Sequence, residues 1–571
     1  MSSFTMPKRG VLLSFLALLV FSFSFAQERT VSGTVSAAEE GPLPGVNVLV
    51  KGSTTGTVTD LNGEYRINVP SPESVLVFSS IGYTNEEVTV GNQSTINIEL
   101  LPDIKSLSEV VVVGYGTQER RDLTGSVASV DGEELQNMAI QSVEQGLQGR
   151  VAGVNVTQQS GAPGAAMQVQ IRGIGSIGNS EPLFVIDGIP VINDNGATGN
   201  NNTNALANLN PADIESMEIL KDASAAAIYG ARAANGVVLI TTKRGTAGET
   251  KINLDIQSGI QQPWRLLELT DIDGYKELSD ELSENANLPR VAALQIPEEL
   301  VNRTDWQEEV FRTAPINTIN FGVSGGSEGA RFNVSANYQD QEGILIESNF
   351  ERIGFRVNTD FEKGRFRFGE SLTVSRTKFQ SYQGGNTNPL FMPPNRPVLN
   401  PDNLGGYAGN RIIDEQDANN PVGQANLFDD FTTRYRALGN VYAEFDILDN
   451  LTYRLNAGVD FIYGNRYQYI APYEFGDRRT QPFATLSENN SYTLSPLLEN
   501  TLNYNETFGK HSLGVLVGYT RQSFERRSAV AEGRNTANSV VRVLDGVNDV
   551  PRVNGNQQEF ALVSYLGRLT Y

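Results

Sequence analysis

The feature that most constrains this chain is an alternation of apolar and polar residues through its C-terminal half, from Lys251 onward. Successive side chains of a β-strand point to opposite faces, so each alternating segment has one apolar and one polar face. In residues 330–339 the two sets are Phe332, Val334, Ala336 and Tyr338 against Arg331, Asn333, Ser335, Asn337 and Gln339. About ten or eleven such strands can be counted, a pattern typical of a transmembrane β-barrel with a polar interior. A soluble sandwich or propeller is the alternative.

The N-terminus has a different kind of apolar stretch. Lys8 and Arg9 precede an apolar run over residues 11–25, and the run ends at Ala26 in a small-x-small pattern. A positive segment, a short apolar core and small residues at a cleavage position are typical of a secretory signal peptide. We therefore expect residues 1–26 to be removed by cleavage between Ala26 and Gln27. A membrane anchor is the alternative, but a spanning helix needs about 20 apolar residues and this run is shorter.

Composition argues against several functional classes. The chain has no Cys and one His (His511), which excludes thiol chemistry and Cys-ligated metals and leaves little room for His-based sites. The net charge of −22 argues against nucleic acid as a partner, because that affinity comes largely from Lys and Arg. The string GIGSIG at 173–178 matches a dinucleotide motif, but no helix or βαβ unit follows it. We expect no catalytic residues, no cofactor, no metal site and no enzymatic activity.

Residues 27–102 have the pattern of a small β-sandwich. Val46, Val48 and Val50 fall on one face of a strand, and Asn62-Gly63 is a hairpin signal. About seven short strands at this spacing can enclose a small independent core. The stretch resembles the carboxypeptidase-regulatory-like domain found at the front of some exported bacterial proteins.

The segment that follows, residues 103–122, contains the sequence EVVVVGYG at 109–116 between charged residues. Four consecutive valines favour a β-strand, and an exposed apolar strand is an aggregation hazard that proteins normally cover. Such a strand has a function when it pairs with the exposed sheet edge of a partner protein. The alternative is an ordinary buried strand of the next domain.

Residues 123–246 are rich in Gly, Ala, Ser and Asn and indicate a compact α+β unit. The pattern predicts a helix followed by a strand in VEQGLQGRVAGVNV and a strand running into a Gly-rich turn in AMQVQIRGIGS. It predicts a hairpin over 182–191, a strand over 214–220, a short helix over 223–229 and a partner strand over 236–242. The turns Asp187-Gly188 and Asn235-Gly236 are interpreted as hairpin chemistry rather than ligand contacts.

The order of these segments, with IRGIGS, PLFVIDGIPV and DIESMEILKDASAAAIYGARAANGVVLITTKRG, resembles the SusC/RagA type of TonB-dependent outer-membrane transporter. The resemblance covers essentially the whole chain. It implies a mainly β protein with an N-terminal sandwich, a plug domain at 123–246 and barrel strands over 247–571. It also implies an outer-membrane location, with lipid around the barrel, and no nucleic-acid partner.

The same resemblance names partners and residues. The segment 103–122 would be a linker carrying the TonB box, whose contacts with TonB would come from Glu109, Val110, Val111, Val112, Val113, Gly114 and Tyr115. The plug motifs contain Arg172, Gly173, Asp187, Gly188, Lys221, Asp222, Tyr229, Gly230, Arg232, Asn235 and Gly236. Of these, Arg172, Lys221 and Arg232 would either bridge to acidic residues of the barrel interior or be solvated. A SusD-type surface lipoprotein would cover the mouth, and the cargo would be an oligosaccharide or a peptide.

Geometry bears on the size of the barrel. A plug of about 125 residues is roughly 35 Å across. Eleven strands enclose a barrel of about 22 Å and twenty-two strands one of about 44 Å, and only the larger holds the plug. The chain also ends inside an alternating strand. We therefore expect the first half of a barrel of about 22 strands, and a C-terminally incomplete copy; a genuine last strand ending at Tyr571 is the alternative.

The expected function is import driven by TonB. A receptor or adhesin that binds ligand without transport is the main alternative, and an enzyme such as a glycosidase is a remote one. The polar stretches 383–426 and 532–556 are predicted to be long extracellular loops. The segment 264–312 is predicted to be partly helical and to pack outside the barrel wall.

Overall fold

The computed structural model describes most of the chain beyond the N-terminal segment. The described residues are 29–37, 41–53, 55–80, 83–101, 110–112, 114, 117–119, 126–136, 138, 140–176, 180–191, 206–291, 294–295, 302–385, 388–410, 418–476, 479–536 and 540–571. The predicted signal peptide, with its cleavage position at Ala26 and Gln27, lies outside them and stays a prediction. The chain divides into two compact units, of which the smaller holds the N-terminal domain.

The N-terminal domain is a sandwich of two four-stranded sheets. One sheet contains β1 (Arg29–Ala37), β2 (Gly41–Pro42), β5 (Glu64–Val69) and β8 (Ile98–Leu100). The other contains β3 (Asn47–Val50), β4 (Gly56–Val58), β6 (Val75–Ser79) and β7 (Glu86–Thr89). Val46, Val48 and Val50 are buried in its core, as their alternation predicted. Two short strands follow and pair with each other, β9 (Val110–Val112) and β10 (Thr117–Glu119).

The middle unit is built on a five-stranded sheet in the order β11 (Val127–Asp131), β16 (Ile214–Leu220), β17 (Val237–Thr242), β14 (Leu183–Ile186) and β15 (Ile189–Val191). A separate hairpin joins β12 (Val154–Gln158) to β13 (Met167–Ile171). The strand over 214–220, its partner strand and the hairpin over 182–191 are confirmed. The short helical elements are α3 (Gly132–Gln136), η2 (Glu144–Leu147), η3 (Pro211–Asp213), α4 (Ala223–Ala226) and η4 (Ala227–Ala233).

Two helix predictions in this unit need correction. The segment 143–149 forms only the single 3₁₀ turn η2 rather than an α-helix. The helix predicted over 223–229 is α-helical only in α4, and the following turn η4 bends at Gly230, which has a φ of 69°. Both segments are short and Gly-rich or Ala-rich, so their form depends on packing rather than on intrinsic helix propensity.

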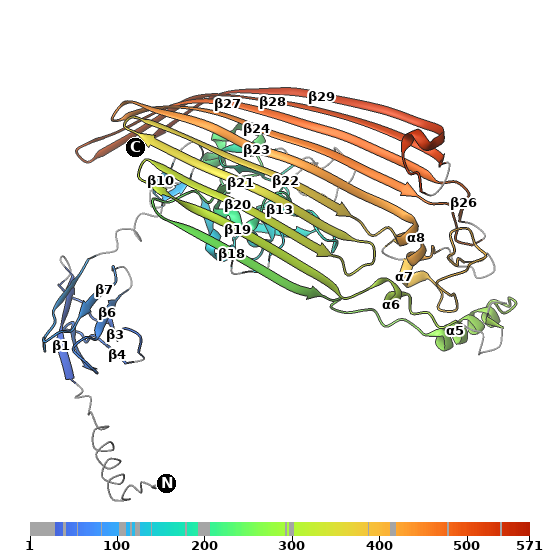
Figure 1. The fold of residues 1–571 in the computed structure, drawn as a ribbon, viewed down its shortest axis with the longest axis horizontal. Helices are drawn as coiled ribbons and strands as arrows, with labels where there is room; N and C mark the ends of the chain where they lie inside the picture. Colours follow the sequence, from blue (N-terminus) through green and yellow to red (C-terminus); the bar gives the residue numbers. More distant parts are fainter. Residues whose placement is uncertain are drawn as a thin grey trace, which may run out of the picture. The chain divides into compact units, whose positions relative to one another are not determined.

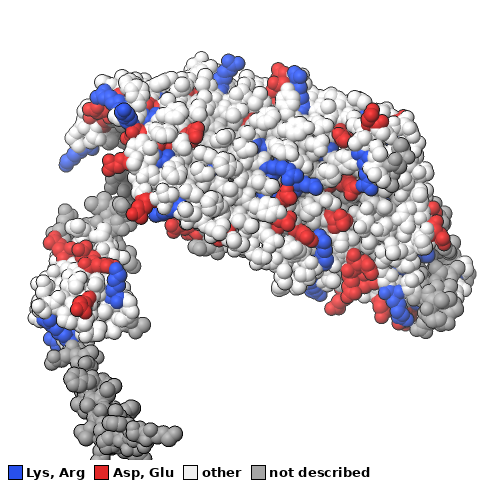
Figure 2. All heavy atoms as spheres, viewed as in Figure 1, with Lys and Arg blue, Asp and Glu red and all other residues white. Residues whose placement is uncertain are grey.

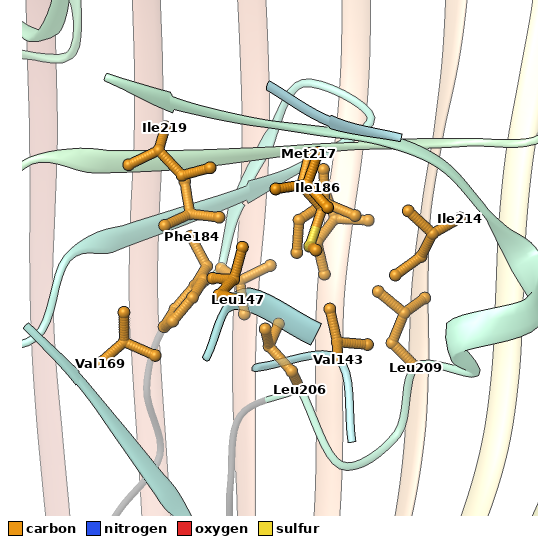
Figure 3. Packing of buried hydrophobic residues seen from close by; sticks show 14 of the residues in the cluster. Val143, Leu147, Val169, Phe184, Ile186, Leu206, Leu209, Ile214, Met217 and Ile219 are labelled. Carbon is orange, nitrogen blue, oxygen red and sulfur yellow. The ribbon is translucent and has the colours of Figure 1, made fainter. Parts of the chain in front are cut away.

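The core of the middle unit is apolar and closely packed. Figure 3 shows Val143, Leu147, Phe184 and Ile186 pointing toward one another beneath the five-stranded sheet, with strands of the large sheet behind them. Phe184 is 5% exposed, and Leu438 and Leu497 of the large sheet belong to the same cluster. Each large apolar side chain buried here contributes roughly 1.5–3 kcal/mol. The middle unit therefore rests on the large sheet through apolar as well as polar contacts.

The large sheet contains ten antiparallel strands in sequence order. They are β18 (Gly248–Gln261), β19 (Ala314–Ser327), β20 (Ala330–Glu342), β21 (Asn349–Lys363), β22 (Phe366–Gln380), β23 (Phe428–Leu448), β24 (Leu451–Ile470), β27 (Thr485–Phe508), β28 (His511–Thr536) and β29 (Val547–Thr570). The prediction of ten or eleven strands is confirmed. The middle unit lies against one face of this sheet (Figure 1). We call this sheet the wall.

The polarity of the two faces of the wall is the reverse of that in a soluble protein. Arg356 and Asn358 face the middle unit and are each 1% exposed, whereas Ile353 and Phe355 on the opposite face are each 47% exposed. In Figure 2 most of that opposite face is neither basic nor acidic. Soluble proteins bury apolar side chains and expose charged ones, so an apolar outer face with a polar inner face indicates lipid outside.

The two ends of the wall differ in their connections. Tight turns at residues 328–329, 364–365, 449–450 and 509–510 join the strands at one end. The other end has the longer connections, which contain α5 (Ile272–Asn285), α6 (Trp306–Val310), α7 (Asn388–Phe391), α8 (Pro421–Leu427), β25 (Tyr473–Glu474), β26 (Thr480–Gln481) and η8 (Leu544–Gly546) (Figure 1). In the described part of the chain no helix combines the length and the hydrophobicity that a membrane crossing requires.

Two loop predictions are corrected at this end. Most of residues 532–556 belongs to β28 and β29 rather than to a loop, because these strands continue beyond the roughly 9–11 residues that a tilted strand needs to cross a bilayer. The segment 264–312 is partly helical as predicted, but α6 does not pack outside the wall. Trp306 is buried against Met392, and its indole N–H donates to the Pro393 carbonyl at 3.0 Å.

Candidate functional site

The closest polar contact between the middle unit and the wall is made by Arg356 of β21. Its guanidinium contacts the carboxylate of Asp187 and the hydroxyl of Thr242, and it donates to Ser371 Oγ at 2.9 Å. Thr242 also donates its backbone N–H to Asp187 Oδ1 at 3.0 Å. The side chains of Arg356 and Asp187 are 2% and 4% exposed. We call Arg356, Asp187, Thr242 and Ser371 the Arg356 cluster.

The chain geometry presents Asp187 to this cluster. The residue lies in the two-residue turn between β14 and β15, and its φ is 47°. Asp and Asn are the residues other than Gly that most readily adopt this left-handed conformation. The prediction of a turn is therefore correct. The Asp187 carboxylate also bonds to Arg356 of the wall, which the sequence did not indicate.

The charge state of Asp187 follows from two opposing effects. Burial by itself raises the pKa of this carboxyl. Arg356 and Arg244, together with hydrogen bonds from Thr242, outweigh burial and hold the pKa of Asp187 below its usual range. The carboxylate is therefore ionised at neutral pH. A buried ion pair of this kind is costly to break from one side, because the remaining charge stays buried without its partner.

Other contacts fasten the same stretch of the middle unit to the wall. Arg352 of β21 donates to the Leu209 carbonyl at 3.1 Å, and Ser335 of β20 donates to Asp213 Oδ1 at 2.7 Å. Burial raises the pKa of Asp213 despite Arg356 and the Ser335 hydrogen bond. Further pairs are Asn358 with the Lys243 carbonyl, Gln522 with the Pro190 carbonyl, Arg232 with Gln522 and Arg244 with Asp360. Within residues 187–244, the described parts (187–191 and 206–244) are thus held at many points along the wall.

The remaining motif residues that the sequence singled out lie mostly within the middle unit. Arg172 pairs with Asp222 at 2.5 Å, and the Lys221 ammonium donates to the Ala152 carbonyl at 2.8 Å. Arg232 does reach the wall, where its guanidinium contacts the amide of Gln522. Asn235 donates to Ser176 Oγ at 3.3 Å, and Tyr229 is buried. Gly173, Gly188, Gly230 and Gly236 all have positive φ.

The segment predicted to contact TonB is described only in part. Val110, Val111 and Val112 form β9, while Glu109, Val113 and Tyr115 lie outside the described residues. Gly114 has a φ of 62°, and a Cβ added to it would lie 2.8 Å from Ile228 Cγ2. Gly114 also lines a cavity of about 320 Å³ together with Asp187 and Arg244. The segment is therefore in contact with the stretch that the Arg356 cluster fastens.

Gly114→Ala should loosen this contact. The new methyl group meets Ile228, and the left-handed backbone costs about 1–2 kcal/mol for a residue with a Cβ. We expect a cysteine introduced at Thr117 of the otherwise cysteine-free chain to react with maleimide several times faster in this variant.

Gly509→Ala is the matched control. Gly509 has a φ of 65°, but nothing lies within 4 Å of an added Cβ, so it carries the backbone cost without the collision. Equal labelling rates at position 117 in the Gly114→Ala variant and in the unsubstituted protein would show that Gly114 does not hold the segment.

The chain matches two known domain families and several curated receptors. Residues 31–112 match the CarboxypepD_reg-like domain, and residues 119–237 match the TonB-dependent Receptor Plug Domain. The TonB-dependent receptor P3 of Formosa agariphila is 35% identical over 99% of this chain and 55% of its own length. SusC of Bacteroides thetaiotaomicron is 30% identical over 98% of this chain and 56% of its own. The chain belongs to the SusC-like TonB-dependent receptors.

A solved structure supports the receptor fold. The RagAB peptide importer in its open-open state aligns with a TM-score of 0.69 and 27% identity, over 81% of this chain and 54% of that one. The receptor chain spans about half the length of the curated relatives it matches. The middle unit is the plug of this family. TonB-dependent receptors are not enzymes, which agrees with the expectation from the sequence.

Sequence reasoning missed the wall side of the receptor's plug attachment. The sequence pattern did not single out Arg352, Arg356 or Gln522. The available signal was the alternation itself, since Arg356 stands between Phe355 and Val357 and therefore falls on the polar face that a barrel directs inward. Such a charge needs a partner nearby, because an unpaired buried charge is costly.

Proposed function

We propose that this receptor forms the plug and part of the barrel of an outer-membrane importer driven by TonB. Membership of the SusC-like receptors supports the general role of nutrient import. The apolar outer face of the wall supports a position in lipid. In transmembrane barrels short turns lie on the periplasmic side and long loops outside, so the end of the wall with tight turns would face the periplasm.

The proposed mechanism depends on one contact within the chain. Gly114, in the segment proposed to bind TonB, lies against Ile228, which belongs to the stretch 187–244 that is fastened to the wall. A pull on this segment from the periplasm would therefore act directly on that stretch. The Arg356 cluster would resist until the pull separates Arg356 from Asp187. Displacement of the plug from the wall would then open a path for cargo.

The partners follow from the same proposal. TonB would pair with the strand centred on Val110 to Val112, where main-chain hydrogen bonds provide affinity. A SusD-like lipoprotein would cover the outer mouth, by analogy with SusC and RagAB. The cargo would be an oligosaccharide or a peptide.

Deletion of residues 109–116 in the full-length gene product tests this function. We expect growth on the transported glycan or peptide as sole nutrient to be lost, because the pull no longer reaches the plug. Surface binding of the same nutrient should remain. The control is Leu61→Ala, because Leu61 is an exposed turn residue of the N-terminal domain and its loss leaves both sheets of that domain intact. Growth that survives the 109–116 deletion would favour a receptor that does not use TonB.

A further inference from the structure

A groove lies on the outer face of the wall, on the side opposite the plug. Its volume is about 510 Å³, and its described lining comes only from the wall strands β24, β27, β28 and β29. Tyr463 of β24 lines it, is 39% exposed and lies two residues from Phe461, so both point to the same face. Through the cross-strand partners Ala437 and Val374, Phe461 lies in the same outer row as Phe355. The groove is therefore separate from the contacts between plug and wall.

The groove forms where large outward side chains lie beside very small ones. One row of successive cross-strand partners supplies the large side chains Tyr463, Tyr492, Arg527 and Gln557. In the adjoining row Ala529 of β28 pairs with Gly555 of β29, and both are exposed. The floor therefore carries only a methyl group and a hydrogen, while aromatic rings and polar side chains rise at its side.

The groove begins at the level where the apolar outer face ends. After Tyr463 the next outward residue of β24 is Asn465, and after Ala561 the next outward residue of β29 is Glu559. A strand tilted by about 40° gains roughly 2.6 Å of height per residue, so Gly555 lies roughly 15 Å above Ala561. A phospholipid headgroup extends only roughly 5–8 Å beyond the hydrocarbon. The upper part of the groove therefore lies beside a taller headgroup.

Above the groove the chain covers its own outer face. Tyr469 and Leu486 continue the outward rows of β24 and β27, yet each is only 1% exposed, because Leu544 and Val547 pack against them. Arg542 of the same segment lies 4.1 Å from the centre of the Tyr469 ring. The groove is thus bounded by the apolar lipid-facing surface below and by protein above, and it is continuous with the surface that faces lipid.

The open polar atoms of the groove suit a sugar. The Asn490 oxygen accepts from the Tyr463 hydroxyl at 2.9 Å and from the Asn465 amide at 2.8 Å, and no hydrogen bond among the described residues uses the Asn490 nitrogen. The Gln557 amide nitrogen donates to Glu559, and its oxygen has no donor in the described part of the chain. One open donor and one open acceptor match hydroxyl groups, which donate and accept. The tyrosine rings add apolar surface for the C–H face of a sugar.

The charges around the groove do not favour a phosphate. Arg527 is the one basic residue of the described lining, and its Nε lies 3.1 Å from the Glu525 carboxylate. Tyr492 donates to the same carboxylate at 2.7 Å, and Glu559 contacts Gln557 at the other end of the row. One positive charge is therefore accompanied by two negative ones, unlike the basic pockets that bind phosphorylated headgroups.

We infer that this groove binds the saccharide headgroup of a glycolipid of the outer leaflet. The groove adjoins lipid, reaches higher than a phospholipid headgroup, and presents amides and aromatic rings rather than a basic pocket. The site requires the outer-membrane position of the wall but not TonB. It is also distinct from any path for cargo, because its described lining contains no plug residue.

Native mass spectrometry of the purified full-length protein in detergent tests this site. The probes are rough lipopolysaccharide, which is lipid A with a core oligosaccharide, then lipid A without the core, and the free core oligosaccharide. We expect rough lipopolysaccharide to bind about tenfold more tightly than lipid A, because only its core sugars reach the groove. The free core oligosaccharide should bind more weakly than the intact lipid, because no acyl chains hold it beside the wall.

Gly555→Leu and Ala529→Leu should each abolish the preference for rough lipopolysaccharide, because the added side chain fills the floor of the groove. A Cβ at Gly555 meets only the Ser528 carbonyl oxygen, at 3.5 Å, so the strand is not strained. Gly567→Leu is the matched control. Gly567 lies on the same face of β29, its added Cβ meets only the Leu516 carbonyl oxygen at 3.9 Å, and it lies outside the groove. Thermal melting checks that each variant folds.

Equal binding of rough lipopolysaccharide and lipid A to the unsubstituted protein would overturn the assignment, and so would a preference that survives in both groove variants. Free core oligosaccharide that binds as tightly as the intact lipid would replace the glycolipid by a soluble glycan. Deletion of residues 109–116 should leave the preference unchanged, so the lipid test and the import test fail independently of each other.

Discussion

Arg356→Met should release the plug segment 187–244 from the wall. The substitution keeps an unbranched side chain but removes the charge that faces Asp187, and that carboxylate then stays buried without its partner. Removing one member of a buried ion pair costs about 3–5 kcal/mol. We expect amide hydrogen exchange in peptides covering residues 183–191 and 237–244 to accelerate by roughly two to four orders of magnitude.

Arg367→Met is the matched control for this prediction. Arg367 bonds to Glu444 at 2.7 Å and to Asp446 at 2.8 Å, and both partners belong to the wall. Its loss should leave exchange in the plug unchanged. The double variant Arg356→Met/Asp187→Asn should be closer to the original protein than Arg356→Met, because the buried carboxylate is neutralised as well. Unchanged exchange in Arg356→Met would show that the cluster does not fasten the plug.

The parts of the fold that the sequence predicted are those set by local patterns. The period of two in residues 330–339 placed Ser335, Asn337 and Gln339 on the plug side before any partner was known, and all three are buried there. The hairpin at Asp187-Gly188 was also predictable, because its turn depends on two residues. The type of helix in the segment 143–149 was not predictable, because the conformation of so short a segment depends on the residues that pack around it.

The parts that were not predictable join residues far apart in the chain. Asp187 and Arg356 are separated by 169 positions, and nothing local in either sequence names the other. The error at residues 532–556 has another cause. Strands that continue beyond the lipid face water on both sides, so polar residues there do not indicate a loop.

The central claim is that import requires the plug segment 187–244 to leave the wall. A reversible covalent bond across that interface tests it most directly. Ser335 Oγ lies 2.7 Å from Asp213 Oδ1, and the chain contains no Cys, so Asp213→Cys/Ser335→Cys introduces one defined pair. This side-chain contact does not fix the Cβ–Cβ distance that a direct disulfide needs, so a short bis-methanethiosulfonate reagent, which thiols release again, joins the two sulfurs.

Uptake should be lost when this pair is cross-linked and should return when the cross-link is reduced, because the link holds the plug to β20 against the pull. Each single-cysteine variant should transport under both conditions. Mass spectrometry of the linked peptides measures the cross-linked fraction in the same cells. Full uptake by a population in which the cross-link is complete would contradict the account.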